Sequence, residues 1–308
     1  MQIAIIGAGA MGGLFGGRLA ASGQDVSMID RPGPHLDAMR ADGLLLDIDG
    51  RAERIPVRVG VAGEFSGQQD LLIVFTKGTD TVAALNSCRH LAGPGTAVLT
   101  LQNGLGHAER VGSVLPQAAL LIGMTDWPAD LRGPGHVVSH GHGVIKLWSA
   151  DGADTPVVHA VTAALNAAGL RCAADPEVTI AIWEKVAFNA AMNTVTAIGR
   201  VTVGALADSP DGRRLVHEIV EETLAVARAH GVDVVSARVH ATIAKAFAGH
   251  RDHQSSMLQD VLAGRQTEIE TINGSIVALG EALGIPTPVT RTMRDLVRLV
   301  DARQEHRI

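Results

Sequence analysis

The sequence predicts an α/β protein in which a doubly wound parallel sheet is followed by an all-helical C-terminal domain. Three observations predict this fold. A short apolar run rich in β-branched residues, Ile3–Ile6, leads directly into a glycine-rich segment that opens a helix. Further apolar runs of strand length alternate with polar or helical stretches as far as Leu147, as β-α-β units require. From about Asp175 the strand signals stop and helical patterns take over.

Length and composition favour two globular domains and argue against several classes of protein. The chain has 308 residues, 46% of them hydrophobic and 19% charged, which excludes a disordered chain. Its net charge of −6 provides no basic field, so nucleic acid is not an expected partner. The two cysteines, Cys88 and Cys172, form neither a disulfide framework nor a metal-ligand spacing. A reducing, cytoplasmic location is therefore expected.

We expect no association with a membrane. The most apolar stretch, residues 3–17, is interrupted by glycines and falls short of the roughly 20 residues that a spanning helix needs. It also lacks the basic segment that precedes the apolar part of a secretory signal.

The glycines of this stretch have the spacing of a dinucleotide-binding turn. Gly7, Gly9 and Gly12 form the pattern GxGxxG, with Ala10 and Met11 inside it, between the first strand and the first helix. Gly7 permits the tight turn, Gly9 allows a pyrophosphate to approach the backbone, and Gly12 allows the helix to pack on the strand. The N–H groups at the start of the helix then face the phosphates. This context predicts a Rossmann-type domain rather than a glycine-rich helix without a ligand.

An acidic residue follows the second predicted strand, Asp25–Ile29. Asp30 lies 18 residues beyond Gly12, where a carboxylate binds the hydroxyls of an adenosine ribose. Arg31 follows directly and is suited to a 2′-phosphate instead. The sequence therefore predicts a dinucleotide with an adenosine ribose, and it leaves open whether that ribose carries a 2′-phosphate.

The remaining strands of this domain are expected at residues 71–75, 97–101 and 119–122, with a terminal hairpin of 137–139 and 144–147 joined by 140–143. Polar residues follow two of these strands, at Thr76–Lys77 and at Gln102–Gly104. Because ligands bind at the carboxyl ends of parallel strands, these loops are candidate parts of the site. Ordinary loop polarity is the alternative.

The composition changes near residues 173–176. We expect a dinucleotide-binding domain over 1–172 and a helical domain over 173–308, with a cleft between them. The helical domain is predicted from the following segments: 179–199, 214–230, 236–247, 265–283 and 289–302.

The first of these helices carries a polar stripe in an apolar setting. Lys185, Asn189 and Asn193 are spaced at i, i+4 and i+8, and their neighbours are mostly apolar. Unpaired polar groups on a buried helix cost about 1–3 kcal/mol each, so this stripe needs partners. The partners are either a ligand or neighbouring backbone carbonyls. A second polar cluster covers 255–260 and 264–274, where Glu268 either orders a substrate hydroxyl or is a solvated charge.

Taken in order, these motifs resemble the ketopantoate reductase family over nearly the whole chain, most specifically in the segment from Ser255 to Gly274. The resemblance implies reduction of a 2-oxo acid, 2-dehydropantoate, by NADPH in pantothenate biosynthesis. It implies Lys185 as the catalytic acid and Glu268 as the group that binds the substrate hydroxyl. The residues implied to hold the substrate are Asn189, Asn193, Ser256 and Asn103, with Asn103 also near the nicotinamide and Lys77 lining the cofactor side. The expected partners are a small 2-oxo acid and a second copy of the chain.

Asp30 departs from the family pattern, since a carboxylate repels a 2′-phosphate, so NADH is a plausible second cofactor. The alternatives are a β-hydroxyacid dehydrogenase or another 2-oxo acid reductase of the same plan, and a nucleotide-sensing protein without catalysis. His136, His140 and His142 lie close in sequence, but no carboxylate or thiol completes a set, and no metal site is predicted.

Overall fold

The computed structural model describes residues 1–304, which form two compact units. The first unit contains Met1–Gln102 and His107–Val178, and the second contains Asn103–Gly106 and the chain from Thr179 onward. The sequence places the domain boundary after residue 172. The contacts divide at Val178 instead, because Cys172–Ala174 forms a strand of the first unit.

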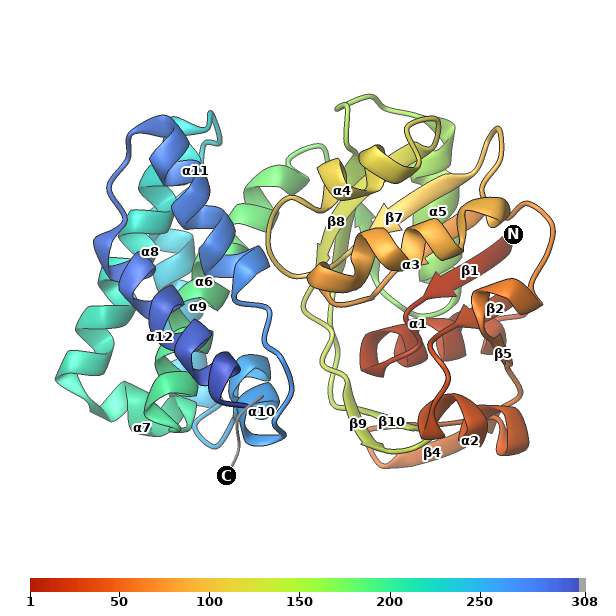
Figure 1. Cartoon of the computed structure of the whole chain (residues 1–308), viewed down its shortest axis with the longest axis horizontal. Coiled ribbons are helices and arrows are strands. Elements are labelled where there is room, and N and C mark those ends of the chain that lie inside the picture. Colours follow the sequence, from red (N-terminus) through yellow and green to blue (C-terminus); the bar gives the residue numbers. More distant parts are fainter. Residues whose placement is uncertain (305–308) are drawn as a thin grey trace. The chain divides into compact units, whose positions relative to one another are not determined.

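The first unit is built on a sheet of eight strands (Figure 1). In spatial order these are β12 (Cys172–Ala174), β11 (Ile145–Ser149), β8 (Ala119–Thr125), β7 (Ala97–Thr100), β6 (Leu71–Val74), β1 (Gln2–Ile6), β2 (Asp25–Ile29) and β5 (Arg58–Gly60). All neighbours are parallel except β11, which runs antiparallel to β8. The predicted doubly wound parallel sheet is confirmed. The strand order reverses at β1, which is where such sheets bind ligands.

Helices cover both faces of this sheet, so its central strands are buried and read as continuous apolar runs. On one face, Ala4 and Ile6 of β1 pack with side chains of α3 (Thr81–Ser87) and α4 (His107–Val114). On the other, α1 (Ala10–Ala21) lies over Ile5 and Met28, and α5 (Pro156–Ala167) packs beside it. The unit also contains α2 (Pro34–Asp42) and the 3₁₀ turns η1 (Ala62–Glu64), η2 (Gly78–Asp80) and η3 (Arg89–Leu91).

A second sheet of four strands was not predicted, and it shows that the predicted terminal hairpin is wrong. Its order is β4 (Arg51–Ile55), β3 (Leu44–Ile48), β10 (His136–Ser139) and β9 (Asp130–Gly133). β10 pairs with β3 and β9, whereas β11 pairs with β8 and β12 of the large sheet. Residues 140–143 cross between the sheets because Gly141 N donates to Asp49 Oδ1 at 2.6 Å and Gly143 lies against Trp127. A Cβ at Gly143 would lie 2.4 Å from the Cα of Trp127.

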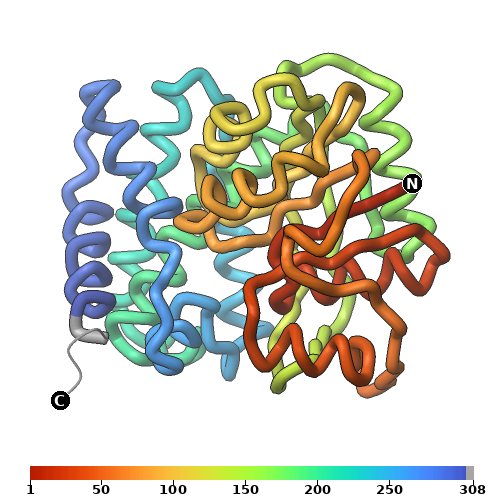
Figure 2. Tube along the Cα trace, turned by 45° about the vertical axis from the view of Figure 1, so that its right-hand side comes forward, coloured from red at the N-terminus to blue at the C-terminus, as the bar shows by residue number. Residues whose placement is uncertain are grey.

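The second unit contains no strand among its described residues: from Thr179 it consists of helices and the loops that connect them, which Figure 2 shows from green to dark blue. Its elements are α6 (Val178–Gly199), α7 (Val203–Asp208), α8 (Pro210–Ala229), α9 (Ser236–Gly249), α10 (Ser256–Leu262), the π-helical turn η4 (Glu270–Gly274), α11 (Ser275–Leu283) and α12 (Pro288–Gln304). The core forms around α6, where Ala187, Ala190 and Ala191 are fully buried among side chains of α8 and α11. The predicted all-helical second domain is confirmed. No helix within residues 1–304 is long and apolar enough to span a membrane.

One predicted helix, 265–283, is wrong in its first five residues. The helix starts at Glu270, because side chains hold the preceding segment in an irregular conformation. Thr267 Oγ1 donates to Asp301 Oδ2 at 2.7 Å, and Arg265 Nε donates to Asp260 Oδ1 at 2.8 Å. The short helices α7 and α10, which the sequence patterns did not predict, are each capped by a hydroxyl.

Candidate functional site

The turn between β1 and α1 has the geometry of an anion site made of backbone. Gly7 has a φ of +93°, and a Cβ there would lie 2.7 Å from Thr76 N. A Cβ at Gly12 would lie 1.9 Å from Gly7 O, so this position accepts only glycine. Gly9 instead faces open space, with no atom within 4 Å of an added Cβ. It caps α1 without a side-chain hydrogen bond, and Ala10, Met11 and Gly12 follow as the first helical turn. The N–H groups of this turn therefore suit a phosphate.

Asp30 stands at the end of β2 beside this turn. Its Oδ2 accepts from Ala8 N at 2.9 Å, and its Oδ1 accepts from Arg31 N at 2.7 Å. Each carboxylate oxygen retains a second lone pair, so ribose hydroxyls can still bind. The Arg31 side chain is 84% exposed, with its guanidinium 3.7 Å from Asp80. Sequence reasoning missed His35, whose Nε2 lies 2.9 Å from Ala8 O and so contacts the turn.

The polar residues after β6 and β7 meet at the carboxyl edge of the sheet. Gln102 Nε2 donates to Thr76 O at 2.6 Å and to Thr81 Oγ1 at 2.8 Å, and Gln102 Oε1 accepts from Thr100 at 3.0 Å. Lys77 follows Thr76, is half-buried and precedes η2. The amide network therefore fixes the backbone from which the Lys77 side chain extends.

In the second unit, the predicted polar stripe lies on α6. Lys185 and Asn189 are half-buried, and Asn193 is only 5% exposed. The carboxylate of the preceding Glu184 binds Arg238 at 2.8 Å, so it ties α6 to the start of α9. The side-chain amides of Asn189 and Asn193 form no hydrogen bond with any other residue of the described chain. These two amides have the unsatisfied donors and acceptors that a ligand site requires.

Glu268 and Asn103 are brought together although 165 positions separate them. Asn103 Nδ2 donates to Glu268 Oε2 at 3.3 Å. The segment Asn103–Gly106 is anchored to the second unit by Leu105 N, which donates to Thr271 O at 2.8 Å. Gly104 has a φ of +99°, and a Cβ there would lie 2.1 Å from Thr271 O. The sequence did not predict that Thr271 anchors this segment. The only signal was Gly104, because a glycine often marks a place where two backbone segments lie close together.

Ser256 is exposed at the first position of α10, and within residues 1–304 its side chain forms no hydrogen bond with the other candidates. Its neighbour Ser255 is buried and caps α10, with its Oγ 2.7 Å from Thr196 Oγ1 on α6. Asn273 Nδ2 donates to Ala190 O of α6 at 3.2 Å. The segment 255–274 is therefore tied at two points to the helix that carries Lys185. Sequence reasoning missed Thr196, which has no motif of its own.

The second unit thus offers an ammonium, two side-chain amides and a carboxylate oriented by a third amide. Amides and an ammonium bind carboxylate and carbonyl oxygens, and a carboxylate accepts from a hydroxyl. An ammonium also stabilises and protonates an oxygen on which negative charge develops. This set suits a small oxo or hydroxy acid.

Comparison with known proteins gives the same result over the whole chain. The family model described as "Ketopantoate reductase PanE/ApbA" matches residues 3–152, and its C-terminal counterpart matches 177–301. The 2-dehydropantoate 2-reductase of Streptococcus pyogenes serotype M1 is 34% identical over 303 residues, covering 98% of both chains. A PanE/ApbA family ketopantoate reductase from Ralstonia eutropha JMP134 has a TM-score of 0.92 and 33% identity, covering 99% of this chain and 100% of that one. A D-mandelate dehydrogenase with NADH and anilino(oxo)acetate has a TM-score of 0.94 and 31% identity, with the same coverage.

Proposed function

Because the chain belongs to the ketopantoate reductase family, we propose that it is an NAD(P)-dependent oxidoreductase that reduces 2-dehydropantoate to pantoate, a step of pantothenate biosynthesis. The observation that carries the chemistry is the face of α6 formed by Lys185, Asn189 and Asn193. This proposal uses both units of the chain, and relatives of the same name align along almost all of it.

The first unit fits a nicotinamide dinucleotide. The open space at Gly9 and the uncapped start of α1 would hold the pyrophosphate, with Ala10, Met11 and Gly12 supplying N–H groups. Asp30 or Arg31 would hold the adenosine ribose or its phosphate, and Lys77 would line the same site. When bound, the reduced nicotinamide supplies the hydride. The protein's contribution here is to orient the nucleotide through backbone groups of the turn and of the first helical turn.

In this proposal Lys185 is the general acid. As hydride adds to the 2-oxo carbon, negative charge develops on the carbonyl oxygen, and the Lys185 ammonium stabilises that oxygen and donates a proton to it. The product is the 2-hydroxy acid, and Lys185 regains its proton from solvent. Asn189, Asn193 and Ser256 bind the polar groups of the substrate.

Glu268 recognises the substrate hydroxyl. Its carboxylate accepts from that hydroxyl, and the Asn103 amide orients it through the hydrogen bond to Oε2. A charge-assisted hydrogen bond of this kind contributes about 1.5–3 kcal/mol, enough to favour a hydroxylated oxo acid over its deoxy analogue.

We propose activity with both cofactors and a modest preference for NADPH. Both oxygens of Asp30 already accept backbone N–H groups, which weakens but does not abolish their affinity for ribose hydroxyls. The Arg31 guanidinium is exposed and has only a long contact to Asp80, so it can reorient toward a 2′-phosphate. The homodimer and the cytoplasmic location stay predictions.

A second candidate is a dehydrogenase for another 2-oxo acid, which the likeness to a D-mandelate dehydrogenase favours. A steady-state screen of 2-dehydropantoate, its deoxy analogue and aryl oxo acids, each with NADPH and NADH, separates the two. The proposal expects the highest kcat/KM with 2-dehydropantoate. A higher value with an aryl oxo acid establishes the second candidate, and no nucleotide oxidation with any acid rejects both.

A further inference from the structure

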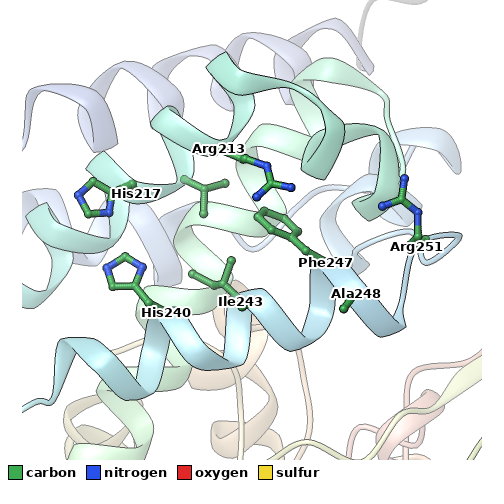
Figure 3. A pocket seen from close by; sticks show the side chains of 9 residues that line it. Arg213, His217, His240, Ile243, Phe247, Ala248 and Arg251 are labelled. Atoms are coloured by element: carbon green, nitrogen blue, oxygen red, sulfur yellow. The ribbon is translucent and has the colours of Figure 1, made fainter.

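Three metal-ligating side chains meet on the second unit, on elements that the reductase site does not use. His217 and Glu221 lie one turn apart on α8, and His240 faces them from α9. The His240 Nε2 is 2.7 Å from Glu221 Oε1, and the two imidazole rings stack with centroids 4.9 Å apart. One ligand atom from each residue lies within 4.8 Å of the other two. Figure 3 shows the two histidines side by side at one end of a hollow.

We propose that His217, Glu221 and His240 bind a divalent transition-metal ion, for which Zn²⁺ is the best match. Imidazole nitrogen and carboxylate oxygen bind Zn²⁺ at about 2.0–2.2 Å, and two histidines with one glutamate is a recurrent set for it. Hard cations such as Mg²⁺ and Ca²⁺ prefer oxygen ligands only.

The carboxylate of this cluster is not paired with a lysine or arginine. Its Oε1 accepts from Ser236 Oγ and from His240 Nε2, each at 2.7 Å. Within the described chain, Glu221 forms no ion pair with an arginine or lysine. Its neighbours on α8 are committed elsewhere: Glu218 pairs with Arg214, and Glu222 accepts from Val289 N and Thr290 N. No lysine or arginine of the described chain therefore competes with a cation for Glu221.

A hydrogen bond from Ser236 holds the carboxylate of this cluster, and the histidines face solvent. Ser236 Oγ donates to Glu221 Oε1 at 2.7 Å and fixes the carboxylate from the start of α9. His217 is exposed, and both histidines line a hollow of about 430 Å³ together with Arg213 and Phe247. Three protein ligands leave a fourth position of Zn²⁺ for water or an anion. A bound ion would also link α8 to α9.

The test titrates the full chain, freed of metal, with Zn²⁺ against a chromophoric chelator, and with Co²⁺ followed by its visible absorption. We expect one ion per chain at this site and a higher thermal midpoint with Zn²⁺, because an ion that binds only the folded state stabilises it. His217→Ala and His240→Ala should each weaken Zn²⁺ binding by about tenfold or more and reduce the Co²⁺ absorption. His217 is exposed, so its variant tests binding without a loss of core packing.

His159→Ala is the matched control, because His159 pairs with Asp154 at 2.6 Å on the surface of the first unit, and no third ligand group joins this pair among the described residues. It should leave Zn²⁺ affinity unchanged. The proposal is overturned if the wild-type chain binds neither ion, or if His217→Ala and His240→Ala bind both as the wild type does. Nucleotide oxidation should be unaffected by His217→Ala, so this result is independent of the reductase proposal.

Discussion

The two units contribute different chemical groups to the site: the first contributes backbone groups and the second contributes side chains. In the first unit the nucleotide is expected to meet backbone groups, and the positions that matter are glycines whose Cβ atoms would collide or block approach. In the second unit the substrate is expected to meet side chains from separate segments, such as Asn103 and Glu268. A backbone site is encoded by a few adjacent residues, whereas a side-chain site depends on how distant segments fold together. This difference predicts that mutations in the first unit impair stability or nucleotide affinity, whereas mutations in the second unit change KM or kcat for the substrate.

The largest effect should come from Gly12→Ala, because the added methyl group clashes with the backbone of the nucleotide-binding turn. Its Cβ would lie 1.9 Å from Gly7 O, a backbone atom of the turn that joins β1 to α1. We expect a loss of about 3 kcal/mol or more in the free energy of unfolding and no measurable nucleotide binding. Chemical denaturation and nucleotide fluorescence titration measure the two losses.

Gly9→Ala is the matched control, because its Cβ meets no atom within 4 Å and its φ of −62° suits alanine. It should leave stability unchanged yet weaken nucleotide binding roughly 10- to 100-fold, as the pyrophosphate is kept from the N–H groups. Normal nucleotide affinity in Gly9→Ala would place the pyrophosphate elsewhere.

The next largest effect concerns a side chain of the second unit, Glu268, and its role in binding the substrate. Glu268→Ala should raise KM for 2-dehydropantoate by roughly 10- to 100-fold, but change KM for the deoxy analogue little, because only the hydroxyl loses its acceptor. Glu270→Ala is the control, since Glu270 pairs with Arg298 through both oxygens and is exposed. Equal increases on the two substrates would mean that Glu268 has a structural role only.

The smallest effect concerns the choice between NADPH and NADH. Here the side chains of Asp30 and Arg31 add selectivity to a site made of backbone groups. Asp30→Ala should shift the NADPH/NADH ratio of kcat/KM toward NADPH by about tenfold, and Arg31→Ala should shift it toward NADH by a similar factor. Part of any loss in Asp30→Ala will come from the turn itself, because Asp30 accepts from Ala8 N. The ratio removes that shared loss, and a ratio unchanged in both variants would show that neither residue faces the ribose.

What the sequence predicted follows the same division. The buried strands and the glycine turn were predictable because their signals are local: continuous apolar runs and a fixed spacing. The strand β4 was not, since four of its five residues are exposed and it has no apolar run. The hairpin prediction was wrong because the Asp49 and Trp127 contacts that redirect residues 140–143 are remote in sequence.

The candidate site was predictable only in part. The stripe of Lys185, Asn189 and Asn193 on α6 follows the helical period, so it could be predicted directly from the sequence. The Asn103–Glu268 hydrogen bond could not, because it depends on the conformation of Gly104 and its contact with Thr271. The cluster of His217, Glu221 and His240 was missed for the same reason, since it needs α9 to pack beside α8.

The central claim, that the second unit performs the proton chemistry while the first holds the nucleotide, is tested most directly by Lys185→Ala. Steady-state kinetics with 2-dehydropantoate and a separate nucleotide titration should give a kcat lower by roughly 10²–10⁴ and an unchanged nucleotide Kd. Lys245→Ala, an exposed lysine on α9, should have no effect on either. A correctly folded Lys185→Ala enzyme with near-normal kcat would contradict the account.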